Sequence, residues 1–173
     1  MPNKTQMAFA RQVYAAAVEA NTEIDPAFVT AQAMLETGWG SKVIGQANLF
    51  GITKGSQWDG PVVMVKTHEY FKTPNQKFKN PDRILSVCKV KGKNLWYYTV
   101  ERAFKDFSSI GECLKEHERL FQKSGYKDAW PFRKDAYQFA RKICDGVGCK
   151  YATDPAYLTT ITSIIKTVKS KCR

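Results

Sequence analysis

One glutamate, Glu36, stands where an apolar stretch gives way to glycines and a tryptophan. It ends the run Ala33–Glu36 and is followed by Thr37–Gly40, which reads Thr-Gly-Trp-Gly. A carboxyl beside aliphatic and indole surface loses hydration of its charged form and keeps its proton to higher pH. Such a group can protonate a leaving oxygen, so we predict that Glu36 is a general acid. An isolated glutamate at a helix end is more often a solvated surface residue, and the longer sequence context favours the acid.

Three sequence blocks supply that context. They are Gln32–Ser41 (QAMLETGWGS), Ala47–Ile52 (ANLFGI) and Tyr151–Tyr157 (YATDPAY). Together they resemble the glucosaminidase family of peptidoglycan hydrolases, glycoside hydrolase family 73, found in flagellar rod-assembly proteins, autolysins and phage lysins. The resemblance runs from Phe9 to Val168. It implies an α+β, mainly α, lysozyme-like fold in which a helical lobe and a small β-hairpin lobe flank a substrate groove. It also implies an endo-β-N-acetylglucosaminidase that cleaves the β-1,4 bond between GlcNAc and MurNAc, with Glu36 as the acid.

Hydrolysis of a glycosidic bond usually needs a second carboxyl group. The resemblance indicates Glu69, because the run Thr67-His68-Glu69 matches the Thr-x-Glu position where the family places its second acid. Glu101 and Asp59 are its rivals, and Glu69 can also be read as a solvated charge at a strand edge. The resemblance leaves open whether Glu69 activates water in an inverting reaction or whether the acetamido group of the substrate participates.

A tyrosine and several further residues complete the predicted site. The resemblance places Tyr151 near the acid, where its phenol can hydrogen-bond the acetamido group or stabilise developing charge. Aromatic faces pack against sugar C–H surfaces, although each aromatic residue in this set could equally belong to the core. Asp154 precedes Pro155, a position typical of a helix cap. The residues predicted to bind substrate are Trp39, Asn48, Phe50, Tyr70, Asp154 and Tyr157.

Hydrophobic periodicity and capping residues predict the elements that position these groups. We expect helices at 4–20, at 26–36 after an Asp25 cap, at 110–121 after a Ser109-x-x-Glu112 capping box, at 131–144 and from Pro155 onward. A short helical piece is expected at 41–46. Strand-like segments at 61–65 and 95–100, with a hairpin turn at 91–94, place a β-lobe insertion at 57–107 within one catalytic domain spanning 1–173.

Composition and charge limit the possible partners. With 43% hydrophobic and 13% aromatic residues the chain is too apolar to be disordered, and no apolar run approaches the ~18 residues of a membrane span. The net charge is +11, which favours polyanionic partners. Without an aromatic-basic motif we expect no nucleic acid partner. The lysines between Lys72 and Lys93 are candidates for binding anionic cell-wall or outer-membrane polymers; a solvated hairpin edge that blocks strand pairing explains them equally well.

We expect no cofactor and no metal, because the chain has no glycine-rich phosphate loop, no CxxC pair and only the isolated histidines His68 and His117. Cys144 and Cys149 flank a glycine-containing turn that could close a disulfide; two free thiols are the alternative. Residues 1–6 show no secretory signal pattern. We therefore expect a monomer that acts on peptidoglycan glycan strands at the bacterial cell wall or periplasm, delivered by phage lysis, a phage tail or a secretion system, unless the chain has been trimmed.

Two other functions remain open. A muramidase or lytic transglycosylase shares the helical lobe and a catalytic glutamate with the leading candidate. A noncatalytic cell-wall-binding module would require Glu36 to be an ordinary surface residue.

Overall fold

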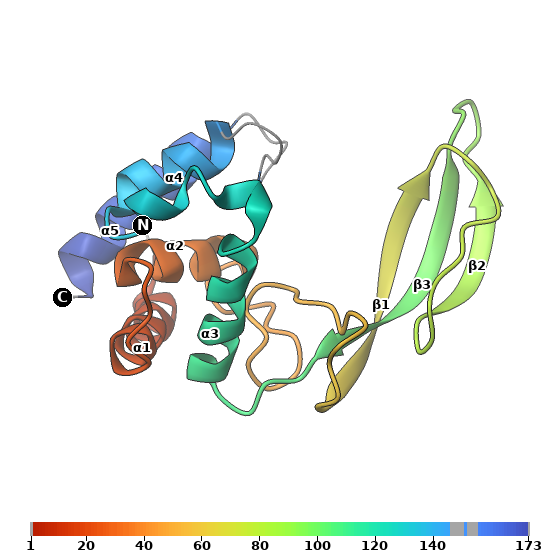
Figure 1. Ribbon diagram of the computed structural model, residues 1–173. Helices are drawn as coiled ribbons and strands as arrows, with labels where there is room; N and C mark the ends of the chain where they lie inside the picture. The colour runs from red at the N-terminus through yellow and green to blue at the C-terminus, as the bar shows by residue number, and fades with distance from the viewer. Residues whose placement is uncertain (1, 146–150, 152–155, 173) are drawn as a thin grey trace. The chain divides into compact units, whose positions relative to one another are not determined.

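The computed structural model describes residues 2–145, 151 and 156–172, and the chain forms two compact units (Figure 1). The helical unit comprises Met1–Phe50 and Phe107–Arg173. The β unit comprises Gly51–Asp106 and so begins before the predicted start of the insertion at residue 57. None of the described helices is both long and apolar enough to cross a membrane.

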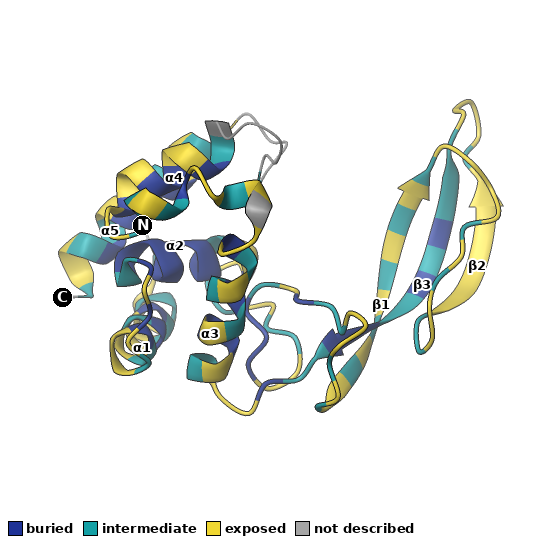
Figure 2. Ribbon diagram, in the orientation of Figure 1, coloured by how far each residue is buried: buried dark blue, intermediate teal, exposed yellow. Residues whose placement is uncertain are grey.

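The helical unit is built around α2 (Pro26–Glu36), which packs against α1 (Lys4–Glu19). The cap predicted for α2 is present, because Asp25 Oδ1 accepts a hydrogen bond of 2.7 Å from the amide of Ala27. Residues Ala27–Met34 are all buried, as the dark blue of α2 in Figure 2 shows. A helix that is buried all round is a core element rather than a surface one, so Glu36 ends the most enclosed helix of the unit.

Three later helices complete this unit: α3 (Ile110–Phe121), α4 (Ala136–Asp145) and α5 (Tyr157–Lys171). Phe28 of α2 meets Phe121 and Phe139 edge to face, with ring centroids 6.2 and 4.9 Å apart, a favoured aromatic geometry. The predicted helix at 131–144 is divided into a 3-10 turn at Trp130–Phe132 and α4. The first residue of α5 is Tyr157, two residues after the predicted start, and Asp154 lies outside the described residues.

A tight left-handed turn follows α2. Gly38, Trp39 and Gly40 have φ values of 55°, 61° and 87°, and the amide of Trp39 donates to the carbonyl of Met34 at 2.7 Å. A Cβ at position 40 would lie 2.6 Å from the ring of Phe9, so close packing as well as backbone conformation requires glycine there. The chain therefore turns sharply from Gly38, two residues after Glu36.

The short helix predicted at 41–46 is wrong. This segment forms turns, and Ile44 and Asn48 exchange backbone hydrogen bonds of 3.0 and 3.1 Å as an isolated bridge. Gly45, with φ of 56°, reverses the chain between them. A glycine in the left-handed region favours a turn over a helix.

The β unit is a three-stranded antiparallel sheet in the order β1-β3-β2, formed by β1 (Val62–Phe71), β2 (Arg83–Lys89) and β3 (Trp96–Lys105). The predicted turn at 91–94 joins β2 to β3, with the amide of Val90 donating to the carbonyl of Leu95 at 2.9 Å. The sequence did not predict β2, because all of its residues are exposed and no apolar alternation marks it. The two ends of the unit also meet, since the amide of Lys105 donates to the carbonyl of Ile52 at 3.0 Å.

Candidate active site

The carboxyl of Glu36 combines access to solvent with partial desolvation. Glu36 is the last residue of α2 and is exposed as a whole residue. The protein packed around its carboxyl removes hydration and thereby raises the pKa of Glu36, whereas a hydrogen bond from Tyr151 lowers that pKa by a smaller amount. The phenol of Tyr151 donates this bond to Oε1 of Glu36 at 3.1 Å. A carboxyl that is reachable from solvent and retains its proton above the usual range is suited to proton donation.

Tyr151 is held firmly in place beside Glu36. Its ring stacks on Phe121 at a centroid distance of 5.7 Å, and its amide donates to the carbonyl of Ile143 at 3.1 Å. Burial, followed by the negative charge of Glu36, raises the pKa of the Tyr151 phenol. The phenol therefore remains a hydrogen-bond donor. The structure brings together two predicted residues that lie 115 positions apart in the sequence.

Tyr157 lies behind Tyr151, in the core. Its ring centroid is 5.5 Å from that of Tyr151, and its hydroxyl accepts a hydrogen bond of 3.3 Å from the buried amide of Gln32. Burial raises the pKa of Tyr157 as well. Of the two interpretations left open for Tyr157, the structure supports the core residue. Sequence reasoning missed Gln32, although its position one helical turn before Glu36 in an apolar helix was a usable signal.

Three other predicted residues of the helical unit belong to the segment that follows Glu36 in the sequence. Trp39 is half-buried within the left-handed turn. Asn48 is completely buried, and its backbone closes the bridge with Ile44. Phe50 is half-buried and stacks on His117 with ring centroids 3.7 Å apart. Asp154 and Cys149 lie outside the described residues.

In the β unit, Glu69 belongs to a cluster of charged side chains. Its Oε1 accepts a hydrogen bond of 2.7 Å from Arg102, which also pairs with Asp82 at 3.3 Å. The second oxygen of Asp82 accepts a hydrogen bond of 2.8 Å from the amide of Ala103. The sequence did not reveal Arg102 or Asp82 as partners of Glu69, because only the register of β1 against β3 places Glu69 and Arg102 on one face of the sheet.

Tyr70 follows Glu69 directly in β1, and successive side chains of a strand point to opposite faces. Its ring lies 5.1 Å from that of Tyr97, with 61% of the residue exposed. Tyr70 and Glu69 therefore do not share one surface of the sheet. Of the rival carboxyls, Glu101 pairs with Arg83 and Asp59 is exposed.

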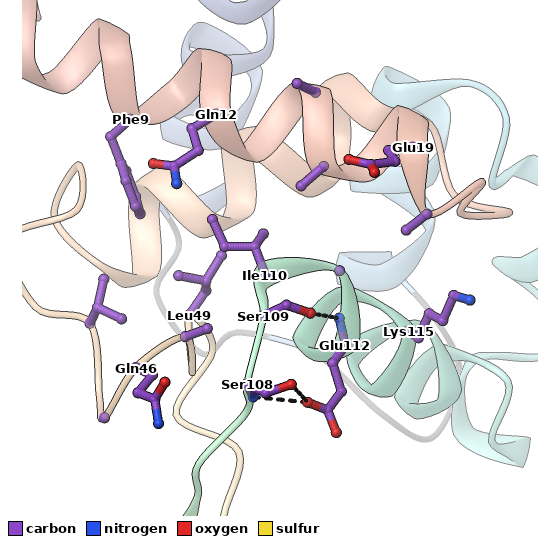
Figure 3. Close-up of a pocket in the computed structure, with 17 residues that line it drawn as sticks. Phe9, Gln12, Glu19, Gln46, Leu49, Ser108, Ser109, Ile110, Glu112 and Lys115 are labelled. Atoms are coloured by element: carbon purple, nitrogen blue, oxygen red, sulfur yellow. Dashed lines mark hydrogen bonds between the residues drawn. The ribbon is translucent and has the colours of Figure 1, made fainter.

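Each unit contains a cavity. In the helical unit a cavity of about 1090 Å³ is lined by α1, residues 43–49 and the start of α3, and Glu36 is not among its lining residues (Figure 3). There the carboxylate of Glu112 accepts hydrogen bonds of 2.9 Å from both the amide and the hydroxyl of Ser108, so it does not bond back to Ser109 as a capping box would.

In the β unit a cavity of about 720 Å³ is lined by Glu69, Arg102 and Asp82 together with residues of the loop before β2. The described residues contain no group of three histidine, cysteine or acidic side chains that could hold a metal ion.

Comparison with known proteins identifies the family. Residues 12–170 match the glucosaminidase family model, described as mannosyl-glycoprotein endo-beta-N-acetylglucosaminidase. The chain is 32% identical over 148 residues to the peptidoglycan hydrolase FlgJ of Escherichia coli K12, an alignment that covers 82% of this chain and 39% of that protein. It is 31% identical over 143 residues to a probable N-acetylmuramidase of Lactococcus lactis subsp. cremoris, covering 81% of this chain and 28% of the relative. The chain thus spans less than half the length of these relatives.

A solved structure gives the same answer for the fold. The C-terminally truncated glycoside hydrolase domain of Salmonella typhimurium FlgJ matches the chain with a TM-score of 0.68 and 25% identity, covering 95% of this chain and 98% of that domain. The predicted α+β, mainly helical, lysozyme-like fold is therefore confirmed. The family match over nearly the whole length and the shared fold agree with the sequence blocks around Glu36 and Tyr151, and the chain belongs to the glucosaminidase family, glycoside hydrolase family 73.

Proposed function

We propose that this protein hydrolyses the glycan strands of peptidoglycan and that Glu36 is the general acid. The observation that carries the proposal is the Glu36 carboxyl, whose pKa is raised by desolvation while the Tyr151 phenol lies 3.1 Å from its Oε1. In the protonated state this carboxyl delivers its proton to the bridging oxygen as the bond to the anomeric carbon breaks. The name peptidoglycan hydrolase carried by the FlgJ relatives supports the choice of polymer and, with it, action at the bacterial cell wall.

The bond that we propose is the β-1,4 linkage between GlcNAc and MurNAc, with GlcNAc on the reducing side of the product. The family model, a glucosaminidase, supports this choice. The relative described as a probable N-acetylmuramidase supports the alternative, in which MurNAc carries the new reducing end. Proton donation by Glu36 is the same in both reactions, so the position of the sugars relative to this carboxyl decides between them.

For the second carboxyl group we propose Glu69. The ion pair with Arg102 holds its carboxylate in a fixed position, as a base that activates water would require. An inverting reaction assisted by Glu69 and a retaining reaction assisted by the acetamido group differ in the anomer first released. NMR of the fresh product from a chromogenic chitooligosaccharide separates these two mechanisms.

We assign Tyr151 the role of stabilising the substrate next to the acid. Its phenol remains protonated, because burial and the neighbouring carboxyl raise its pKa. Such a donor can bond either Glu36 or the acetamido group of a bound sugar. The half-buried rings of Trp39 and Phe50 are proposed to pack against the sugars that follow, and Asn48 to hold the turn that carries Phe50.

The experiment that tests the function is identification of the sugar ends released from purified sacculi. After digestion and borohydride reduction, mass spectrometry should find reduced GlcNAc at the new ends. Reduced MurNAc would assign the chain to the muramidases, and an anhydro-MurNAc end would assign it to the lytic transglycosylases. Sacculi that bind the protein yet release no fragments would contradict catalysis and would support a noncatalytic wall-binding module.

A further inference from the structure

The cavity of the β unit is basic overall, although it contains a proposed catalytic carboxyl. Its volume of about 720 Å³ is of the size that holds small ligands. Three lysines and one arginine line it, against two acidic residues. The charged residues that line the cavity are Lys54, Glu69, Lys77, Lys79, Asp82 and Arg102.

Both acidic residues of this cavity pair with the same arginine, and four basic against two acidic residues leave the lining with a net charge of +2. Arg102 pairs with both Glu69 and Asp82. Lys54, Lys77 and Lys79 have no carboxylate partner within 4.0 Å among the residues that the structure describes. The lysines therefore leave positive charge in the cavity, which would attract a negatively charged ligand.

The segment that carries Lys77 and Lys79 is held against β3 at two places. At one end, the amide of Gln76 donates to the hydroxyl of Tyr98 at 3.2 Å. At the other end, the carboxylate of Asp82 accepts hydrogen bonds from Ala103 and Arg102. A basic loop fixed in this way loses little conformational freedom when a ligand binds, which favours affinity.

The floor between these anchors is aromatic. Phe71 meets Tyr98 edge to face at 5.2 Å and Phe78 at 6.1 Å, and the guanidinium of Arg102 lies 5.9 Å from the centre of the Phe78 ring. Both Phe71 and Phe78 line the cavity. An apolar floor with ammonium groups at its rim fits a short ligand that has an aliphatic body and carboxylate ends.

We propose that this cavity binds the carboxylates of the peptide stem of peptidoglycan, so that the β unit recognises the stem while the helical unit supplies the acid for the glycan. The proposal rests on the proposed function, which makes peptidoglycan the substrate. The stem is a short peptide with the α-carboxylate of a γ-linked glutamate and a free carboxylate at its end. Lys77 and Lys79 each donate to one of these groups, and the alanine methyl groups lie on the Phe71–Phe78 floor.

Direct binding to the whole protein tests the proposal without any need for turnover. The probe is the free stem tetrapeptide, titrated by calorimetry at low salt. We expect wild-type protein to bind it, and Lys77→Glu to weaken binding by about tenfold, since one ion pair becomes a repulsion. The matched control is Lys66→Glu, the same charge reversal at an exposed lysine of β1 that lies on the face opposite Glu69 and outside the cavity; its affinity should remain that of wild type.

Two further probes identify the chemistry that is recognised. A tetrapeptide with both carboxylates converted to carboxamides should bind at least about tenfold more weakly than the parent peptide. An oligomer of glycerol phosphate tests the other source of negative charge. Tighter binding of this oligomer than of the tetrapeptide would overturn the proposal in favour of an anionic-polymer site. Equal affinity of the two tetrapeptides, equal loss in Lys77→Glu and Lys66→Glu, or no binding by the wild type would also overturn it.

Hydrolysis then separates this proposal from the proposed function. Lys77→Glu should raise KM for glycan strands that carry stems and leave kcat/KM unchanged for strands from which an amidase has removed them. Stem binding in a wild-type protein that cuts neither polymer would contradict the proposed function and leave the stem site standing. Equal loss on both polymers would contradict the stem site alone. The thermal melting curve of each variant shows whether its fold is intact, and Lys77→Gln gives a milder change for comparison.

Discussion

The hydrogen bond between Tyr151 and Glu36 joins the two groups on which the proposed chemistry of the helical unit depends. Burial raises the pKa of both groups, and each acts on the other: the phenol lowers the pKa of the carboxyl, and the carboxylate raises that of the phenol. Both effects favour a phenol that donates and a carboxylate that accepts. In the proposed mechanism the protonated form of Glu36 is the active acid, so activity should fall as pH rises through the pKa of this group.

Replacement of Glu36 by glutamine should remove nearly all turnover. The amide is isosteric but has no proton to give, and loss of a general acid costs about 100- to 10,000-fold in rate. Release of reducing ends from sacculi measures the effect, with circular dichroism and sacculus binding as checks of the fold. The matched control is Glu19→Gln, at an exposed glutamate of α1, which should leave the rate unchanged. Lytic activity retained in Glu36→Gln would refute the assignment of the acid.

Replacement of Tyr151 by phenylalanine should shift the pH profile. The ring still stacks on Phe121, but the bond that lowers the pKa of Glu36 is lost. The pKa of Glu36 therefore rises and the acid keeps its proton to higher pH. The alkaline limb of the plot of kcat/KM against pH should shift to higher pH. We also expect a lower kcat, by about tenfold, from loss of one hydrogen bond near the reacting sugar. An unchanged alkaline limb would mean that Tyr151 does not act on the acid.

The residues of the site differ in how far the sequence could reveal them. The prediction for Glu36 depended on its surroundings together with the family resemblance, because a glutamate at a helix end is by itself more often a solvated surface residue. Tyr151 depended on family resemblance, since local pattern gives no distance across 115 positions. Arg102 was not predictable, because its contact with Glu69 depends on strand register and on a β strand pairing that only the fold determines.

At the scale of elements, α3 holds residues 49 and 50, which follow the left-handed turn after α2. The amide of Leu49 donates to Sγ of Cys113 at 3.4 Å, and Phe50 stacks on His117 one helical turn further along. Burial raises the pKa of the Cys113 thiol to about 12, so this cysteine remains a neutral packing residue. His117 is also completely enclosed, and neither of its ring nitrogens has a hydrogen-bond partner among the described residues.

His117 should make the stability of the helical unit depend on pH. Burial lowers its pKa from 6.5 to about 3. The folded state therefore binds fewer protons than the unfolded state, so stability is full above the unfolded pKa and is lost as pH falls from 6.5 toward 3. The linkage amounts to roughly 5 kcal/mol at most, at about 1.4 kcal/mol per pH unit over the shift from 6.5 to about 3.

The test of this linkage is urea unfolding of wild type and His117→Phe at several pH values. At neutral pH the apolar ring loses no hydrogen bond, and we expect a change in the free energy of unfolding within about 1 kcal/mol. Below pH ~6 the variant should be progressively the more stable of the two, since only the wild type must protonate a buried ring. If the free energy of unfolding changed with pH equally in both proteins, His117 would titrate in the same way in the folded and unfolded states.

Gly40 should be the most sensitive position of the turn after α2. In Gly40→Ala the new Cβ meets the ring of Phe9 and the backbone keeps a φ of 87°, so we expect a loss of about 2–4 kcal/mol in the free energy of unfolding. Gly38→Ala is the matched control, because it has a similarly left-handed φ of 55° but meets only the movable hydroxyl of Ser41 at 3.0 Å. Thermal unfolding compares the two. Equal losses would show that backbone conformation alone requires these glycines.

Elements with a clear cap or stripe were predictable, whereas exposed or glycine-broken ones were not. Asp25-Pro26 fixed the start of α2, and Ser109 the start of α3. The strand β2 was missed because its residues alternate only between two exposed faces. The prediction of a helix at 41–46 was wrong because Gly45 takes a left-handed conformation. The sequence pattern there did not distinguish a reverse turn from a single turn of helix.

At the scale of the whole molecule, the positive charge is concentrated in the β unit. Gly51–Asp106 contains 11 basic against 5 acidic residues, a net charge of +6 out of the +11 of the chain. This unit is about a third of the length of the protein. Attraction of this chain to a polyanion would therefore come mainly from the β unit, through exposed side chains whose charge salt screens effectively.

We expect binding to purified sacculi to weaken steeply with salt. Between about 50 mM and about 500 mM NaCl the screening length falls from roughly 14 Å to roughly 4 Å, so long-range attraction of the β unit is lost. Sedimentation with sacculi measures the bound fraction. Hydrolysis of a short uncharged chitooligosaccharide is the control and should change little over the same range. Sacculus binding that is insensitive to salt would mean that the net charge of the β unit does not contribute to it.

The β unit leaves the chain and returns to it at neighbouring points, because Lys105 bonds Ile52 and the amide of Asp106 donates to the carbonyl of Pro61 at 3.0 Å. Because the two ends of this inserted segment lie close together, the segment can be replaced by one of another length without a change in the path of the surrounding helices. The β unit can therefore change in length and in charge while the backbone that carries Glu36 and Tyr151 keeps its path.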